Sequence, residues 1–424
     1  MNHTPHYREY ISILKEELIQ ALGCTEPISL ALAAAKAKEA LGEMPTSCEA
    51  LVSGNIIKNV KAVTVPNTGG LKGIETAVAA GVIGGRPELE LKVLSKVTAE
   101  EIAQMRTFLH DCPIRVTASG GDRVFYIKVT LTSAAHTACC EIMDFHTNIT
   151  LIERDGKVLF HGSGEQGEEA AQTDRSVLSV AEIVSFADTL DTDDVAPILE
   201  PQIECNTAIS REGLKGGWGA EVGKTLLKVH GDSLSTRLRA AAAAGSDARM
   251  NGCDLPVVIV SGSGNQGMTA SLPVIEYAKA VGADHEKLLR ALALSNLITI
   301  HQKTGIGRLS AFCGATSAGC GAACGIAYLD GCRTDVISKT IVNTLGICSG
   351  MICDGAKSSC AAKIAEAVDA GLCGYQMAKD NLGFADGEGI IGADVEKTIA
   401  NVGRLASRGM RRTDEEILNI MLGC

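Results

Sequence analysis

The sequence predicts an α+β protein with a predominantly helical domain and a small, mostly antiparallel sheet subdomain. Hydrophobic residues make up 46% of the 424 residues but aromatic residues only 3%, so the core is built mainly from Ala, Val, Ile and Leu. Small side chains let helix axes approach closely, which suits packed helices. Within residues 88–165 β-branched residues alternate with polar ones, whereas helical spacing of apolar residues prevails from about residue 176. We therefore expect residues 1–87 and 166–424 to form the helical domain and residues 88–165 the subdomain.

The N-terminal part is predicted to be mainly helical. Residues 7–22 have apolar positions at helical spacing and end at a glycine, a common C-cap signal. Pro27 then suits the first turn of a second, almost wholly apolar helix over residues 28–41. A strand-like stretch around residues 62–65 and an Ala/Gly-rich helix over residues 74–83 complete this part.

The subdomain is predicted to begin with a helix over residues 98–111. Four segments with β-branched alternation follow, which are PIRVTAS, RVFYIKVTL, TACCEIMDF and NITLIERDGKVLF. The GD, SAAH and RDG breaks between and within them are typical of turns, so the sheet should be mostly antiparallel. The remaining chain is predicted to be helical, in segments such as SVAEIVSFADTL, LSTRLRAAAAAG, PVIEYAKAVG, HEKLLRALALSNLITIHQKTG, RTDVISKTIVNTLG and KIAEAVDAGL.

Charge and hydropathy exclude several classes of protein. A net charge of −11 argues against binding to nucleic acid or to anionic membranes. No apolar run reaches the roughly 18 residues that a membrane-spanning helix needs. The N-terminal segment is polar and amphipathic and does not resemble a secretory signal, so we expect a cytoplasmic protein with a small-molecule substrate.

The chain contains 16 cysteines, an unusually high number. Because the chain is large and lacks an export signal, a disulfide framework is disfavoured, and most of these residues are expected to be small buried apolar groups. Cys313, Cys353 and Cys360 stand out because they lie in the Gly/Ser/Ala-rich runs SAFCGATSAGC and GMICDGAKSSC. The seven-residue gap between the last two would place both thiols on one face of a helix.

Three thiolates leave one iron of a [4Fe–4S] cube without a protein ligand, and such an iron can act as a Lewis acid on a substrate. Spacing alone does not force this ligand set, because Cys320, Cys324 and Cys348 lie nearby in the sequence. A zinc site would normally close with four ligands at paired spacing. Cys424, the last residue, offers a further thiol that could cap the open iron.

A glycine-rich segment, SGSGNQG at 261–267, follows the apolar run LPVVIV. It fits the G-x-G-x-x-G pattern of dinucleotide-binding folds, but no second strand with an acidic residue follows about 20 residues later. We expect instead a loop that leads into a helix N-terminus and binds a substrate carboxylate, and a simple tight turn stays an equal alternative. The candidate binding residues are Ser261, Gly262, Ser263, Gly264 and Asn265.

Two further segments carry candidate reactive groups. In GCTEP, Cys24 lies at the start of a predicted helix, where the dipole lowers a thiol pKa, so it is a candidate base or nucleophile as well as a candidate structural residue. In HQKTGIGRLSAFCGA, His301, Lys303 and Arg308 precede Cys313. Cations there can clamp a carboxylate, although the spacing of His301 and Lys303 points them in different directions. His146, in HTNI, is more typical of a surface histidine than of a site residue.

Taken together, the motifs GCTEP, PNTGG, HTNI, SGSGNQG, IHQKTGIGRLSAFCGA and the C-x39-C-x6-C set resemble the L-cysteine desulfidases. These proteins are iron–sulfur relatives of the bacterial L-serine dehydratase α-subunit, and the resemblance covers nearly the whole chain. In that family a [4Fe–4S] cluster, and not pyridoxal phosphate, supports β-elimination from a small amino acid. The resemblance implies that Cys313, Cys353 and Cys360 are the cluster ligands and that Cys24 is an active-site thiol acting as general base.

The function implied by this resemblance is an oxygen-sensitive carbon–sulfur lyase that converts L-cysteine to hydrogen sulfide, ammonia and pyruvate. In this hypothesis the side-chain sulfur binds the open iron and the carboxylate binds the 261–267 loop. The first alternative is L-serine dehydratase chemistry at the same site, and the second is a non-catalytic iron–sulfur redox sensor. A zinc-structural protein is a third. An Ala/Gly-rich helical surface makes a homodimer plausible.

Overall fold

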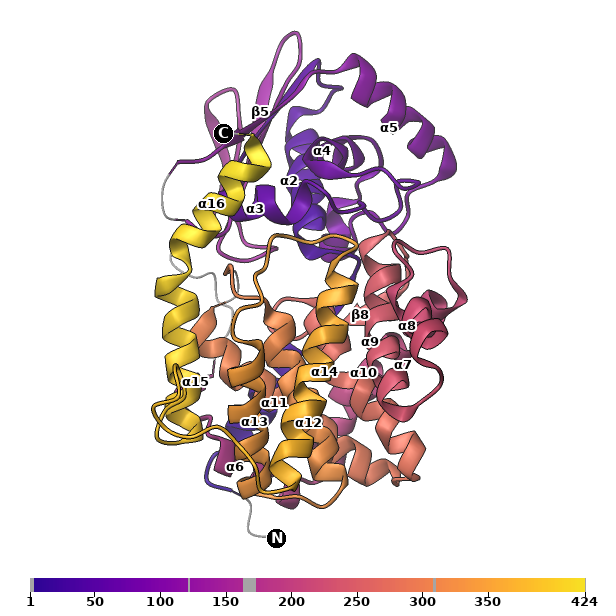
Figure 1. Cartoon of the computed structure of the whole chain (residues 1–424). Coiled ribbons are helices and arrows are strands. Elements are labelled where there is room, and N and C mark those ends of the chain that lie inside the picture. The colour runs from indigo at the N-terminus through magenta and orange to yellow at the C-terminus, as the bar shows by residue number, and fades with distance from the viewer. Residues whose placement is uncertain (1–3, 121–122, 163–172, 308–309, 424) are drawn as a thin grey trace.

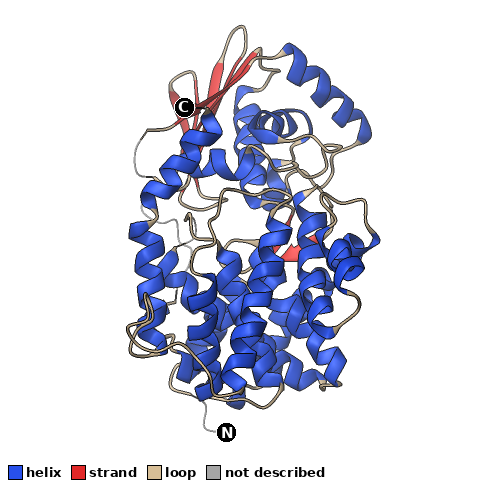
Figure 2. Ribbon diagram, viewed as in Figure 1, coloured by secondary structure: helices blue, strands red, loops and turns tan. Residues whose placement is uncertain are grey.

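A computed structural model describes residues 4–120, 123–162, 173–307 and 310–423 of the chain. Figure 1 shows a body of packed helices in the lower part of the view and a smaller layer that carries the sheet in the upper part. Figure 2 shows that helices dominate and that the strands gather almost entirely in that smaller layer. The predicted fold class, α+β with a small mostly antiparallel sheet, is therefore confirmed.

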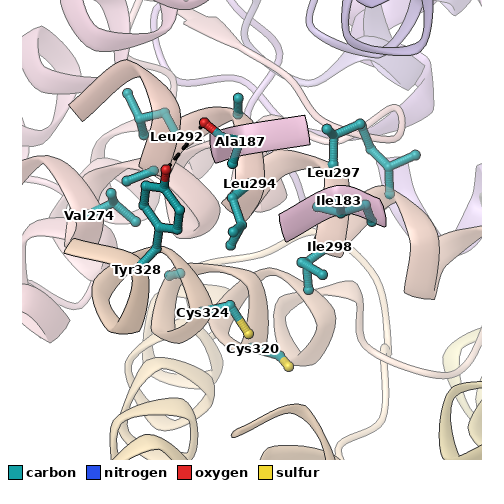
Figure 3. Close-up of a cluster of buried hydrophobic side chains, with 14 of the residues drawn as sticks. Ile183, Ala187, Val274, Leu292, Leu294, Leu297, Ile298, Cys320, Cys324 and Tyr328 are labelled. Carbon is teal, nitrogen blue, oxygen red and sulfur yellow. Dashed lines mark hydrogen bonds between the residues drawn. The ribbon is translucent and has the colours of Figure 1, made fainter. Parts of the chain in front are cut away.

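The helical body has a core of Ala, Leu, Ile and Val with few aromatic residues, as the composition predicts. Its helices are α1 (Tyr7–Glu17), α6 (Val180–Thr189), α7 (Thr192–Lys215), α8 (Val222–His230), α9 (Leu234–Met250), α10 (Gly264–Val281), α11 (His285–Ile306), α12 (Gly314–Leu329), α13 (Thr334–Cys348), α14 (Cys360–Lys379) and α15 (Val395–Arg404). Figure 3 shows the centre of this core, where the Tyr328 hydroxyl donates to the Ala187 carbonyl at 3.2 Å. Cys320 and Cys324 of α12 lie among these apolar side chains.

Over the described residues the sheet has six strands, in the order β3-β2-β4-β5-β6-β7. Only β2 and β3 run parallel, and the other neighbours are antiparallel. The strands are β2 (Ser47–Val52), β3 (Ile114–Ala118), β4 (Tyr126–Thr132), β5 (Thr137–Met143), β6 (Ile149–Arg154) and β7 (Lys157–His161). Helix α2 (Thr25–Leu41) packs on β4 and β5, and α4 (Gly73–Gly84) packs on α2, with α3 (Gly54–Val60) and α5 (Ala99–Asp111) beside them.

This layer takes in more of the chain than the 88–165 segment. Strand β2 lies between β3 and β4 in the sheet, and the second core combines residues of α2, α3 and α4 with those of β4 and β5. The prediction of a strand around residues 62–65 is wrong, because only an isolated bridge between Thr64 and Lys72 forms there. The strand of this region is β2 instead.

A short two-stranded ribbon ties the N-terminal segment to the helical body. β1 (Gln20–Leu22) pairs antiparallel with β8 (Pro256–Val258). The helix expected over residues 7–22 therefore ends early, at Glu17, because the following residues form β1. The ribbon brings the start of α2 into the neighbourhood of the start of α10.

The C-terminal helix crosses from one layer to the other. After α15, a π-helical turn (Leu405–Gly409) leads into α16 (Arg411–Leu422), which packs against α3 (Figure 1). Within the described ranges, no helix combines the length and the apolar character that crossing a bilayer requires.

Candidate active site

A cavity of about 730 Å³ lies between the helical body and helices α2 and α3, with α16 along one side. Most of the residues predicted from the sequence line this one cavity. They are Cys24, Ser261, Gly262, Ser263, Asn265, Lys303, Cys313, Cys353 and Cys360. Segments that are far apart in the sequence therefore meet at a single concave site, which is the usual character of a small-molecule site.

Two of the three clustered cysteines are held by a short antiparallel contact. Phe312 and Ile352 form an isolated bridge, with the Cys313 N–H donating to the Met351 carbonyl at 3.0 Å and the Cys353 N–H donating to the Ala311 carbonyl at 2.6 Å. Cys313 is the N-cap of α12. The expectation that residues 353 and 360 share a helix face is wrong, because α14 begins only at Cys360. The bridge between Phe312 and Ile352 and the turn that leads from Cys353 to Cys360 bring the three thiols to one cavity.

That turn is fixed against α3 by a glycine. Gly355 has φ +96°, and a Cβ at this position would lie 2.0 Å from the Lys58 carbonyl oxygen, so no other residue type is accommodated without a shift. The Cys360 thiol lies 3.6 Å from the Gly355 carbonyl oxygen. The position of the third cysteine thus depends on contact between the two layers of the protein.

The donor set suits an iron–sulfur cluster. Three thiols face one cavity, and burial raises the pKa of the Cys313 thiol to about 12, with the neighbouring Cys353 adding to the shift. Buried thiols of this kind ionise readily only with a metal or another positive charge beside them. Over the described parts of the chain, no three His, Cys, Asp or Glu side chains are grouped tightly enough to hold a single metal ion. A four-iron cube spreads its ligands over several irons.

The other cysteines considered as ligands lie elsewhere. Cys320 and Cys324 are fully buried in the apolar core of the helical body and do not line the cavity. Cys348 also lies outside the cavity lining, with its sulfur 3.6 Å from the Thr316 hydroxyl. Cys424 is outside the described residues.

Cys24 is the N-cap of α2 and only 2% exposed. Burial raises the pKa of its thiol to about 12, and the positive charge of Arg249 opposes this shift. The lowered pKa expected from the helix position is therefore wrong, because the desolvation of a buried thiolate outweighs the helix dipole and the arginine. Cys24 nevertheless lines the cavity.

Arg249, at the end of α9, was not predicted from the sequence. Its guanidinium donates to the Gly23 carbonyl at 2.9 Å and to the Asn265 Oδ1 at 3.2 Å. It thereby connects the residue before Cys24 with the first turn of α10. Nothing in the Ala-rich sequence of α9 marks this arginine, because its partners come from other parts of the chain.

The glycine-rich loop forms a tight turn. Ser261 and Gly262 both have positive φ, +48° and +79°, and the N–H groups and carbonyls of Val260 and Ser263 pair across them. This is the pattern of a type I′ turn, and a non-glycine residue with positive φ is the kind of strained position found at functional sites. Ser263 then caps α10 by accepting from the Gln266 N–H at 3.4 Å.

The other glycines of this loop serve close packing. A Cβ on Gly264 would lie 2.5 Å from the Arg249 Nε, and one on Gly267 would lie 2.0 Å from the Val258 carbonyl oxygen. β8 is only three residues long and pairs antiparallel with β1, so no parallel sheet for a dinucleotide exists at this loop. Gly264 itself does not line the cavity.

His301 and Lys303 point in different directions, as their spacing predicts. The His301 Nε2 lies 2.7 Å from the Glu396 Oε2, and His301 is not part of the cavity lining. Lys303 does line the cavity, and burial lowers the pKa of its ammonium to about 8. His146, which the sequence suggests is a surface residue, is half-buried and lines the cavity.

Several further lining residues were not singled out from the sequence. Glu26 belongs to the GCTEP motif, and its position two residues after Cys24 could have identified it from the sequence. Lys58 on α3 pairs with Asp414 on α16, and Gln266 lies against Gly314, directly after the first clustered cysteine. The side chains of α16 that line the cavity are Arg411, Asp414, Glu415 and Leu418.

Comparison with known proteins agrees with these motifs. The pattern of the family described as serine dehydratase alpha chain matches residues 88–419. A UPF0597 protein of Desulfitobacterium hafniense is 53% identical over 98% of this chain and 97% of its own length. UPF0597 proteins of Lachnoclostridium phytofermentans and Fusobacterium nucleatum are 51% and 46% identical, covering 98% and 97% of this chain and 100% and 98% of their own lengths. The chain therefore belongs to the serine dehydratase alpha chain family, as its motifs imply.

Proposed function

We propose that this protein is an iron–sulfur-dependent lyase that eliminates sulfide from L-cysteine and yields pyruvate and ammonia. The observation that carries the proposal is the meeting of Cys313, Cys353 and Cys360 with Cys24 around one cavity. Membership in the serine dehydratase alpha chain family supports a lyase of that general type. The choice of cysteine as substrate is the finer part of the proposal.

Cys313, Cys353 and Cys360 would hold a [4Fe–4S] cluster. When bound, the cluster supplies a thiophilic Lewis acid that makes the β-substituent of the substrate easier to expel. Everything else required for the reaction comes from the cavity wall. Lys303, buried and facing the same cavity, adds a positive charge beside the thiols.

The substrate carboxylate would bind at the first turn of α10. Residues Ser261–Asn265 line the cavity there apart from Gly264, and the helix N-terminus presents N–H groups that suit an anion. Arg249 holds Asn265 in place and adds its own charge. This arrangement orients the α-carbon of the substrate toward Cys24.

Cys24 would accept the α-proton as its thiolate. Burial makes ionisation of this thiol unfavourable, so the thiolate would depend on the positive charge of Arg249 beside it. As the Cα–H bond breaks, its electron pair forms the Cα–Cβ double bond and the Cβ–S bond breaks, so that sulfide leaves with the sulfur's bonding electrons. The aminoacrylate that remains tautomerises to an imine, which water hydrolyses to pyruvate and ammonia. No conjugated electron sink is needed if proton loss and departure of the leaving group are nearly concerted.

L-serine is the second candidate substrate, favoured by the name of the matching family. It differs from L-cysteine in a single atom, and its hydroxyl would leave from the same place. The two are separated by measuring sulfide and pyruvate from each amino acid with protein reconstituted anaerobically with iron and sulfide. Equal sulfide and pyruvate from cysteine, with slow turnover of serine, supports the proposal. Pyruvate mainly from serine would make the protein a serine dehydratase, and no product from cluster-loaded protein would leave a non-catalytic iron–sulfur protein.

The role of Cys24 is tested separately. Cys24→Ala should keep the iron content of the wild-type protein and lose at least about 100-fold in turnover, the usual scale for removing a catalytic acid or base. Full turnover in this variant would remove Cys24 from the mechanism.

A further inference from the structure

One partly buried carboxylate of the cavity wall, Glu26, has no cationic partner among the described residues, whereas Glu415 on α16 is exposed to solvent. Glu26 lies in the first turn of α2, and its Oε1 accepts from the Asn59 Nδ2 at 3.1 Å. Its Oε2 accepts from the Thr25 hydroxyl at 3.2 Å. Both donors are neutral, and within the described parts of the chain Glu26 forms no ion pair. The two neutral donors fix the carboxylate while leaving its charge available.

Two cations in the same cavity likewise lack a protein counter-ion. Arg249 is 4% exposed and Lys303 is 5% exposed. The guanidinium donates to a backbone carbonyl and to an amide oxygen, its Nε has no partner, and no ion pair with a carboxylate forms at either cation over the described ranges. Buried cations without an anionic partner are costly, so a bound anion there is strongly favoured.

Two of these charges lie near Cys24, since Arg249 donates to the carbonyl of the preceding residue, Gly23, and Glu26 follows in the first turn of α2. Both Arg249 and Glu26 act electrostatically on Cys24, with opposite sign, so the two charges lie in its immediate surroundings. A small zwitterion carries one anionic and one cationic group on a single carbon atom. With its carboxylate toward Arg249 and its ammonium toward Glu26, such a molecule would have its α-carbon near the Cys24 thiol.

A second acceptor lines the same cavity. Gln266 is 6% exposed, and its Oε1 is buried without a hydrogen-bond partner in the described residues. Gly314 leaves room for this amide, since a Cβ there would lie 2.8 Å from the Gln266 Oε1. An ammonium has three donors and can satisfy a carboxylate and an amide oxygen at the same time.

We propose that Glu26 binds the α-ammonium group of the substrate and that Asn59 positions its carboxylate for this contact. The site is then specific for free α-amino acids and rejects carboxylic acids that lack the amine as well as N-acylated or peptide-linked residues. The proposal rests on the proposed function for the identity of the reaction, but the recognition of the amine is testable without turnover.

The test uses the anaerobically reconstituted protein and two unreactive ligands. L-alanine has both charges and no leaving group, and propionate lacks only the amine. Binding is followed by calorimetric titration, supplemented by the ligand-induced rise in Tm. Wild-type protein should bind L-alanine at least about tenfold more tightly than propionate. Glu26→Gln should reduce that preference to below about threefold without weakening propionate, because the charge-assisted hydrogen bond to the amine is lost.

Matched variants separate recognition from folding. Glu39→Gln changes an exposed carboxylate of the same helix and should leave the preference for L-alanine intact. Asn59→Ala should reduce the preference partly, since the carboxylate remains but is less well oriented. A Glu26→Gln protein that keeps its Tm but loses the preference supports the proposal.

Two results would overturn it: wild-type protein that binds L-alanine and propionate equally, or a Glu26→Gln protein that keeps the wild-type preference. Failure of the proposed reaction would give a different result from failure of this proposal. In that case neither cysteine nor serine yields pyruvate, while the dependence of L-alanine binding on Glu26 is still observed.

Discussion

Lys58 on α3 and Asp414 on α16 form an ion pair that joins the two layers of the protein beside the cavity. The lysine side chain is 2% exposed and the aspartate 23%, so the pair is only partly screened by water. Leu418, one turn further along α16, covers Gly54 at the start of α3. The docking of α16 therefore combines this ion pair and this apolar contact with a hydrogen bond that Lys61 donates to the Met421 carbonyl.

Removing the charge of Asp414 should loosen α16 without unfolding the core. Asp414→Asn leaves a buried ammonium without its counter-ion, at a cost of about 2 kcal/mol. Amide hydrogens of α16 should then exchange about 30-fold faster, since about 1.4 kcal/mol corresponds to a factor of ten. Glu416→Gln, on the same helix and exposed, is the control and should leave exchange unchanged. Identical exchange in both variants would show that the ion pair does not hold the helix.

Substitution of individual cysteines should distinguish ligands from core residues. Cys313→Ala, Cys353→Ala and Cys360→Ala should each lower the iron and acid-labile sulfide that the protein retains after anaerobic reconstitution. Cys320→Ala should retain wild-type iron and lose about 1 kcal/mol of stability, because it removes a small buried group from a packed core. Wild-type iron content in the first three variants, or loss of iron in Cys320→Ala, would require another ligand set.

The turn between Cys353 and Cys360 should tolerate no side chain at Gly355. Gly355→Ala combines a left-handed backbone with a clash against the Lys58 carbonyl, and the backbone conformation alone costs about 1–3 kcal/mol. We expect a lower Tm and reduced iron retention. Gly350→Ala is the matched control, because Gly350 is exposed and a Cβ added there would meet no atom within 4 Å. A Gly355→Ala protein indistinguishable from this control would mean that the turn is not constrained.

Asp247 should make the protein less stable as the pH rises. It is fully buried, and desolvation raises the pKa of its carboxyl to about 6, although the Gly223 N–H donates to it at 3.0 Å. The folded state thus binds this proton more tightly than the unfolded state, whose pKa is about 3.9. The favourable contribution is complete below about pH 4, declines between about pH 4 and 6, and is lost above, a difference of about 3 kcal/mol at pH 7.

Asp247→Asn should therefore stabilise the protein most at high pH. The difference in unfolding free energy between the variant and the wild type, from urea titrations, should be larger at pH 7.5 than at pH 5 by more than about 1 kcal/mol. Asp386→Asn, at an exposed position, should show no such dependence. A constant difference across this pH range would contradict a raised pKa of Asp247.

Much of the fold could be predicted because its helices carry their own signals. The helix expected over residues 285–305 corresponds to α11, whose N-cap Asp284 accepts from the Lys287 N–H, and that expected over residues 98–111 corresponds to α5 with a full capping box. β2 could not be predicted in the same way. Its sequence, SCEALV, alternates polar and apolar residues only over the first four positions, and its strand conformation depends on pairing with β3 and β4, which lie more than 60 residues later.

The residues of the candidate site likewise fall into those that local sequence marks and those that depend on distant contacts. Cys313, Cys353 and Cys360 stood out because of their local sequence context, although the helix expected to pair the last two does not form between them. Arg249 could not be predicted, because its partner Gly23 is 226 residues away and no local pattern marks a contact of that range. Glu26 was within a recognised motif, but its lack of a counter-ion became visible only when the whole cavity was assembled.

The order in which the cavity walls follow one another along the chain has a consequence for biosynthesis. Cys24, Arg249 and the three clustered cysteines all precede α16, and α16 lies along the side of the cavity. Segments of a nascent chain fold broadly in the order in which they emerge. While α16 is still being synthesised, the thiol wall can already be complete and the cavity still open on that side, so a bulky inorganic group has a route of entry that later narrows as α16 docks on α3.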